Sequence, residues 1–215
     1  MEVLQQIDGE LLIAIQQLVV AEWLTPVMKF ITMLGDGGYL WIAICLLLLV
    51  FRKTRRLGII CSLSLLLSYI ACNLILKPTI DRIRPWIIFN EVCAFLPHPG
   101  DASFPSGHAA NFMSPSWAFY ISTLPVKTGE MIKNENLPSL GWRGESVSRS
   151  FTHRFGLFAV IMAVLVGFSR LYLGMHFPSD VIGGLLLGLI CATITHAVIR
   201  KIEDNRGVIG ERKRV

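Results

Sequence analysis

Three short polar strings interrupt an otherwise apolar chain, and each lies at the end of an apolar segment. They occupy residues 77–85, 105–108 and 169–180. Ionisable side chains at membrane depth are costly, so they are candidates for function. Together the strings supply three cations, two histidines, a carboxylate and a turn with backbone N–H groups, which suits a phosphate-like oxyanion. The candidate residues are Lys77, Arg84, Ser106, Gly107, His108, Arg170, His176 and Asp180.

The first string offers two kinds of cation. The guanidinium of Arg84 is a planar fork that matches phosphate oxygens, whereas the ammonium of Lys77 is a point charge. The alternative is that both side chains are anchors that reach from the membrane to its polar surface.

The second string, Pro-Ser-Gly-His, is typical of a turn that leads into a helix. The free N–H groups and the dipole of a helix N-terminus favour an anion, and Ser106 adds a hydroxyl donor. The alternative is ordinary helix capping by Ser106, with His108 as a structural histidine at the membrane interface.

The third string pairs His176 with Asp180, four residues later. A carboxylate in that position can accept the imidazole N–H and fix its tautomer, which leaves the other ring nitrogen free to attack. The alternatives are that Asp180 only serves the dipole of a helix start and that His176 is a satisfied interfacial histidine.

The elements that must position these residues are membrane helices. Of the 215 residues, 53% are hydrophobic and 16% are charged, against about 25% charged in soluble domains. We predict an all-α, integral membrane helical bundle of about six transmembrane helices, formed by one domain over 1–215 with a core at 30–200. Polar residues interrupt the first segment, for which we favour a kinked span over an interfacial helix. The predicted segments are 11–34, 38–51, 57–76, 106–124, 155–168 and 181–199.

The charge pattern predicts the orientation of the bundle. Basic clusters at 52–56 and 200–214 are typical of the cytoplasmic side. This orientation puts all three polar strings on the extracytoplasmic face and the polar insert 125–152 in the cytoplasm. Neither cluster comes with interleaved aromatic residues or a recognition fold, so nucleic acid is not an expected partner.

The three strings resemble, in order, the signature of the type-2 phosphatidic acid phosphatase superfamily, which also contains vanadium haloperoxidases. That signature is Lys-x6-Arg-Pro, Pro-Ser-Gly-His and Ser-Arg-x5-His-x3-Asp, and every defining position is present. The resemblance implies that His176 is a nucleophile that forms a phosphohistidine, that Asp180 orients it, and that His108 protonates the leaving oxygen and later activates water. It also implies phosphate binding by Lys77, Arg84, Ser106, Gly107 and Arg170.

The resemblance implies a lipid phosphatase of the plasma membrane that needs no cofactor. No Cys/His or carboxylate cluster has metal-ligand spacing, so we expect no metal. Among lipid phosphates we favour undecaprenyl diphosphate, because Arg82 could meet a second phosphate and because small members of this family often recycle that carrier. The alternatives are a phosphatidylglycerophosphate or phosphatidic acid phosphatase, a lipid phosphotransferase with the same site, and a non-catalytic relative, against which the intact residue set argues. The oligomeric state and the role of the insert, regulatory or partner-binding, stay open.

Overall fold

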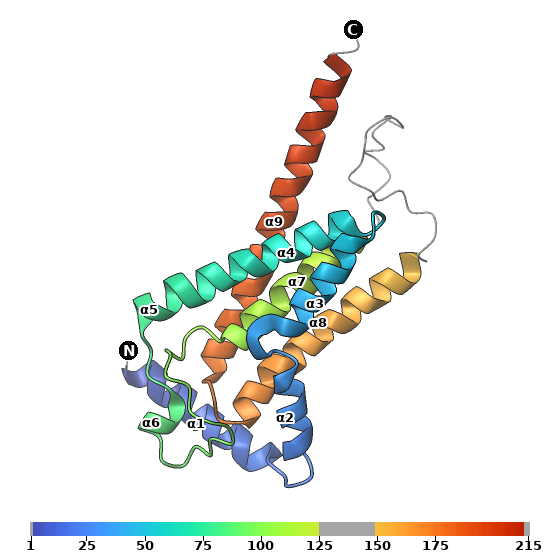
Figure 1. The fold of residues 1–215 in the computed structure, drawn as a ribbon. Coiled ribbons are helices and arrows are strands. Elements are labelled where there is room, and N and C mark those ends of the chain that lie inside the picture. The colour runs from blue at the N-terminus through green and yellow to red at the C-terminus, as the bar shows by residue number, and fades with distance from the viewer. Residues whose placement is uncertain (1, 125–148, 213–215) are drawn as a thin grey trace.

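Figure 1 shows the computed structural model, in which every described element is a helix. The structure describes residues 2–124 and 149–212, so residues 125–148 of the predicted cytoplasmic insert lie outside the described residues. Four helical stretches in this part of the chain are long and apolar enough to cross a membrane: Thr25–Val50, Arg55–Ile88, Thr152–Tyr172 and Pro178–Asn205. The predicted all-helical membrane architecture is confirmed.

The predicted first segment, 11–34, is two helices rather than one. Helix α1 (Glu2–Val19) ends before a short turn, and α2 (Thr25–Met33) follows it. The first membrane-crossing stretch begins at Thr25, in the second part of this segment, whereas α1 lies across one end of the bundle (Figure 1). The buried amide of Gln16, in α1, donates to the backbone carbonyl groups of Tyr172 and Cys93, at 3.0 and 2.9 Å.

A tight turn joins α2 to α3 (Tyr39–Val50). The two helices and this turn form the first membrane-crossing stretch. The turn contains a short 3-10 helix, η1 (Asp36–Gly38). Gly37 and Gly38 have φ of 56° and 67°, a region that glycine enters without steric cost. This turn packs against α7 (Gly107–Thr123).

The second crossing stretch consists of four consecutive elements. Helix α4 (Arg55–Tyr69) continues into a π-helical turn, η2 (Ile70–Leu76), and then into α5 (Lys77–Ile80). Helix α6 (Pro85–Ile88) follows after a short break. Such π-helical turns are found frequently at functional sites, and this one leads directly to Lys77.

Helix α7 (Gly107–Thr123) is the centre of the bundle. It packs against α4, α8 (Arg149–Tyr172) and α9 (Pro178–Arg212). Each of these helices covers or closely matches an apolar segment that the sequence predicts.

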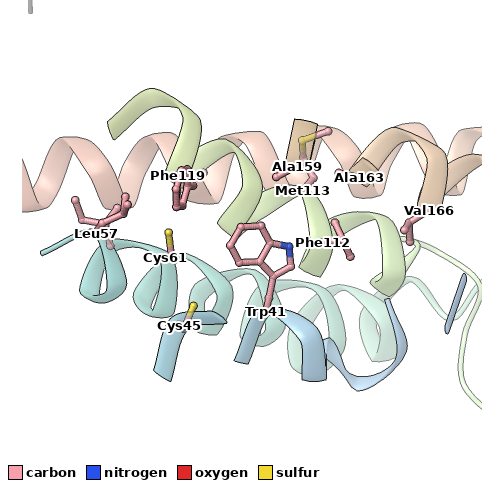
Figure 2. Packing of buried hydrophobic residues seen from close by; sticks show 13 residues of the cluster. Trp41, Cys45, Leu57, Cys61, Phe112, Met113, Phe119, Ala159, Ala163 and Val166 are labelled. Atoms are coloured by element: carbon pink, nitrogen blue, oxygen red, sulfur yellow. The ribbon is translucent and has the colours of Figure 1, made fainter. Parts of the chain in front are cut away.

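Buried apolar side chains from five helices meet around α7. Figure 2 shows Trp41 of α3 beside Phe112 of α7, with ring centroids 6.2 Å apart and an edge-on geometry. Cys61 of α4 and Ala163 of α8 are fully buried in the same cluster. This core fixes the helices whose ends carry the polar strings.

Two glycines allow α9 to approach α7 closely, as their spacing predicts. A methyl group on Gly184 would lie 2.5 Å from the carbonyl oxygen of Ser106, and one on Gly188 would lie 2.7 Å from that of Ala110. The first of these contacts brings the start of α9 against the Pro-Ser-Gly-His turn.

The opposite end of the bundle is basic. Arg56 at the start of α4 donates two hydrogen bonds, of 2.8 and 2.7 Å, to the carboxylate of Glu203 near the end of α9. The polar strings and the basic clusters therefore lie at opposite ends of the same helices.

Candidate active site

The first and second polar strings meet at the start of α7. Lys77 is 7% exposed, and its Nζ lies 3.9 Å from the position that a methyl group on Gly107 would take. The helix therefore begins against a buried ammonium group. An anion at this place would meet both the Lys77 charge and the positive end of the α7 dipole.

Arg84 lies just before Pro85, with the extended backbone that a following proline favours. Its Nη1 donates to the carbonyl oxygen of Met175 at 2.9 Å and lies 3.4 Å from Nε2 of His176. The guanidinium thus brings the first string to the third, and it faces the ring nitrogen predicted to attack.

A carboxylate of the loop before α7 bridges two of the predicted phosphate ligands. Asp101 forms an ion pair with Nζ of Lys77 and accepts a 2.5 Å hydrogen bond from Nη2 of Arg84. Burial by itself would raise the pKa of Asp101, but the hydrogen bonds and charges of Lys77 and Arg84 outweigh it and hold this pKa below its usual value. Asp101 therefore carries a negative charge where the sequence predicts an anion.

Two buried polar atoms of the predicted phosphate ligands lack a hydrogen-bond partner among the described residues. They are Oγ of Ser106, which precedes α7, and Nε of Arg170, near the end of α8. Arg170 is positioned by Thr32 of α2, whose Oγ1 accepts a 2.8 Å hydrogen bond from its Nη1. Unpaired buried donors are costly, so these two fit an incoming acceptor.

His176 lies in the short connection between α8 and α9 and is 1% exposed. Burial is the largest cause that lowers its pKa, to about 3; Asp180 raises it, and the charges of Arg170 and Arg84 lower it further. The imidazole is therefore neutral at physiological pH, with a lone pair for attack.

Asp180 divides its two oxygens between His176 and the surrounding structure. Oδ2 lies 3.7 Å from Nδ1 of His176, too far for a hydrogen bond, and accepts hydrogen bonds from Oγ of Ser103 at 2.5 Å and from the backbone N–H of Phe177 at 2.9 Å. Oδ1 accepts a 2.6 Å hydrogen bond from Nη1 of Arg82. The carboxylate is fixed beside the imidazole by three donors.

His108, in the first turn of α7, contacts a carboxylate in the turn between α2 and α3. Its Nε2 lies 2.7 Å from Oδ1 of Asp36. A histidine held by a carboxylate at the edge of a cationic site has the geometry of a general acid and base.

Arg82 corrects one expectation. The sequence suggests Arg82 as a cation for a second phosphate. In the structure Arg82 is an ion-pair partner of Asp180 and Asp8, at 2.6 and 2.7 Å. It therefore gives no support to a diphosphate subsite.

The structure thus brings all eight sequence-predicted residues to one end of the bundle and adds Asp8, Asp36, Asp101 and Ser103. Three cations and a neutral histidine around a helix start can hold a phosphoryl group and attack it. Among residues 2–124 and 149–212, no group of three or more His, Cys, Asp or Glu side chains has the geometry to hold a metal ion.

A family model described as "PAP2 superfamily" matches residues 57–204, which include all three polar strings. The chain belongs to the PAP2 superfamily. It shares 33% identity over 165 residues with an undecaprenyl-diphosphatase of Sulfolobus acidocaldarius, a match that covers 77% of this chain and 66% of that protein. It shares 33% identity over 190 residues with phosphatidylglycerophosphatase B of Bacillus subtilis, which covers 86% of this chain and 79% of that protein.

A solved structure supports the same placement. The crystal structure of a transmembrane PAP2-type phosphatidylglycerolphosphate phosphatase from Bacillus subtilis matches with a TM-score of 0.70 and 29% identity, over 94% of this chain and 89% of that one. This PAP2 chain is a membrane lipid phosphatase, as the sequence resemblance predicts.

Asp101 yields a prediction about anion affinity, because a phosphate must displace its carboxylate from Lys77 and Arg84. We expect Asp101→Asn to lower the Ki for inorganic phosphate about fivefold. This factor corresponds to roughly 1 kcal/mol, the upper range for an ion pair with a half-exposed partner. The measurement is product inhibition of hydrolysis. Glu91→Gln, on the same exposed loop, is the control and should leave the Ki unchanged. A weaker phosphate affinity in Asp101→Asn would show that the carboxylate organises the cations instead of competing with the anion.

Proposed function

We propose that this PAP2 enzyme hydrolyses a lipid diphosphate, undecaprenyl diphosphate, through a phosphohistidine intermediate. The observation that carries the chemistry is the approach of Nη1 of Arg84 to Nε2 of His176, at 3.4 Å. It places the neutral imidazole nitrogen next to a phosphate-binding cation, where the phosphorus of a bound substrate would lie. Phosphoryl transfer depends mainly on such positioning and charge stabilisation.

In the first step Nε2 of His176 attacks phosphorus, and the bond from phosphorus to the leaving oxygen breaks. Lys77, Arg84 and Arg170 neutralise the phosphoryl oxygens, with donors from Ser106 and the Gly107 N–H. His108 gives its proton to the leaving oxygen, which departs as the lipid product.

In the second step His108 accepts a proton from water while the water oxygen attacks phosphorus. The P–N bond breaks, the electron pair returns to Nε2, and inorganic phosphate leaves. Both histidines regain their starting protonation, so the cycle balances without a cofactor.

The diphosphate specificity is supported by the relative from Sulfolobus acidocaldarius, which is named an undecaprenyl-diphosphatase. The second candidate is phosphatidylglycerophosphate, which is favoured by the fold match to the Bacillus subtilis phosphatase. Both are lipids, and apolar tails add about 0.8 kcal/mol for each methylene buried between helices.

The experiment for the substrate compares kcat/KM for undecaprenyl diphosphate, phosphatidylglycerophosphate and phosphatidic acid in one detergent. We expect at least a tenfold preference for the diphosphate. A tenfold preference for either glycerolipid would show that this glycerolipid is the substrate instead. A preference for water-soluble phosphate esters would contradict the proposed lipid diphosphate.

We also propose that the active site faces the extracytoplasmic side of the plasma membrane. The support is the separation of the site from the basic end, where Arg56 and Glu203 pair. The chain has five cysteines, of which four are buried and Cys93 is exposed in the loop at the site end.

We therefore expect a membrane-impermeant thiol reagent to label the wild-type protein in intact cells and to spare Cys93→Ser. Arg52→Cys, in the Cys93→Ser background, places an exposed thiol at the basic end and should react only after permeabilisation. The reverse pattern would invert the proposed orientation.

A further inference from the structure

Helix α1 is joined to the catalytic residues by a chain of buried charges. Arg82 lies between two carboxylates, donating from Nη1 to Oδ1 of Asp180 at 2.6 Å and from Nη2 to Oδ2 of Asp8 at 2.7 Å. The Asp180 side chain is fully buried, and those of Asp8 and Arg82 are 7% and 16% exposed. Asp8 belongs to α1, outside the residues that the family model matches.

We propose that Asp8 is a positioning residue for catalysis, which acts through Arg82 and Ser179 to hold Asp180 and, with it, His176. This inference rests on the proposed function, because it takes His176 as the nucleophile. Under it, α1 is part of the catalytic apparatus and not only a membrane-surface helix.

The first argument is that the two carboxylate oxygens of Asp180 have different partners. Its Oδ2 faces His176, so rotation of the carboxylate would change what the imidazole meets. Arg82 occupies the other oxygen and is the one charged donor to it among the described residues. The orientation of the carboxylate therefore depends on where Arg82 is held.

The second argument is that Arg82 is held from two sides. Its guanidinium carbon lies 4.2 Å from the ring centroid of Phe177, the residue directly after His176. Asp8 supplies the second restraint and balances the charge. Without Asp8, the Arg82 cation would lose its second carboxylate in a largely buried place, which is strongly unfavourable.

The third argument is the start of α9. Asp8 accepts a 3.0 Å hydrogen bond from the backbone N–H of Ser179 and a second from the Ser179 hydroxyl. Arg82 also donates to the Ser179 hydroxyl at 2.6 Å. A carboxylate from α1 thus caps the first turn of the helix that carries Asp180, where negative charge is favourable.

Helix α1 is also fixed at its other end, so Asp8 has a rigid base. The amide of Gln16 bonds to the backbone of Tyr172 and Cys93, and the Tyr172 hydroxyl donates to the carbonyl of Ala21 at 2.9 Å. The restraint on Arg82 therefore comes from a helix docked at two points.

The test compares Asp8→Asn with Glu10→Gln, a matched change at an exposed carboxylate of the same helix. We expect Asp8→Asn to lower kcat about tenfold, while KM and the Ki for inorganic phosphate stay within twofold, because Lys77, Arg84 and Arg170 are untouched. Glu10→Gln should behave as wild type. A kcat within twofold of wild type, or a Ki that rises in parallel with the loss of kcat, would overturn the proposal.

Further variants establish that Asp8 acts through Arg82. Arg82→Lys should keep more activity than Arg82→Gln, because it retains the charge. The double variant Asp8→Asn/Arg82→Gln should be no slower than Arg82→Gln alone, and additive losses would contradict the proposal. If Asp8→Asn does not fold, Ser179→Ala removes one Asp8 contact and should lower kcat about threefold at an unchanged Ki. Equal kcat in Ser179→Ala would then count against the proposal.

This experiment is separable from the proposed function. An active His176→Ala variant would overturn the phosphohistidine route. The comparison of Asp8→Asn with Glu10→Gln measures instead how much the Asp8 carboxylate of α1 contributes to kcat. A normal Asp8→Asn alongside an inactive His176→Ala would overturn the role of Asp8 alone.

Discussion

His176→Ala should abolish phosphate release while the protein stays folded, with a loss of about four to six orders of magnitude in kcat. The imidazole is the one neutral nitrogen nucleophile among the described residues that lies against Arg84, and alanine leaves no atom to form the P–N bond. The measurement is phosphate release from the lipid substrate in detergent, with thermal unfolding as the test of folding.

The pKa of His176 also predicts how the loss of activity depends on pH. Because burial lowers that pKa to about 3, the ring is neutral at every pH above roughly that value. The ratio of wild-type kcat to His176→Ala kcat should therefore be the same at pH 5 and at pH 8. A matched control is His98→Ala, in the loop at the same end, whose ring stacks on Trp86. Near-normal turnover in folded His176→Ala would show that water attacks phosphorus directly.

The positions of the catalytic candidates could be predicted from sequence because each polar string ends an apolar segment. In a membrane protein, a charged side chain or a histidine at such a boundary is costly unless it faces the bundle interior or a polar partner. The basic clusters then put all three strings at one end, and the structure brings them together there. The contact of Arg84 with His176 follows from this arrangement of helix ends.

The supporting carboxylates could not be predicted in the same way. Asp36 lies in a glycine-rich turn and Asp101 in an irregular loop, so neither has a periodic pattern that predicts its partner. Asp8 contacts Arg82 only because α1 docks across the bundle end. Gln16 contributes to that docking through its hydrogen bonds to Tyr172 and Cys93, and the sequence does not indicate these partners.

Helix α1 also shows why an apolar segment can be misassigned. Residues 11–34 are apolar enough in composition, but buried polar contacts divide them between α1 and α2. The exposed apolar side chains of α1, Val3, Ile7, Leu11 and Leu18, follow a helical spacing that suits a membrane surface.

His108→Ala should slow hydrolysis of a lipid phosphate by about two to four orders of magnitude, the usual contribution of a general acid. The loss in the first step, formation of the phosphoenzyme, should be much smaller, within about tenfold, for 4-nitrophenyl phosphate, because its phenolate leaves without a proton. The physical basis is the contact of Nε2 of His108 with Oδ1 of Asp36, at 2.7 Å, which fixes the imidazole that the proposed mechanism uses as a general acid.

The second half of the cycle gives this variant a further signature. If His108 also activates water, then the phosphoenzyme formed from 4-nitrophenyl phosphate should break down slowly, and His108→Ala should release a burst of nitrophenol equal to the enzyme present. Asp36→Asn, which keeps the imidazole but removes the charge that holds it, should give an intermediate loss and a weaker burst. Equal losses in the rate of phosphoenzyme formation from the lipid and from the nitrophenyl ester would mean that His108 binds the phosphoryl group and transfers no proton to the leaving oxygen.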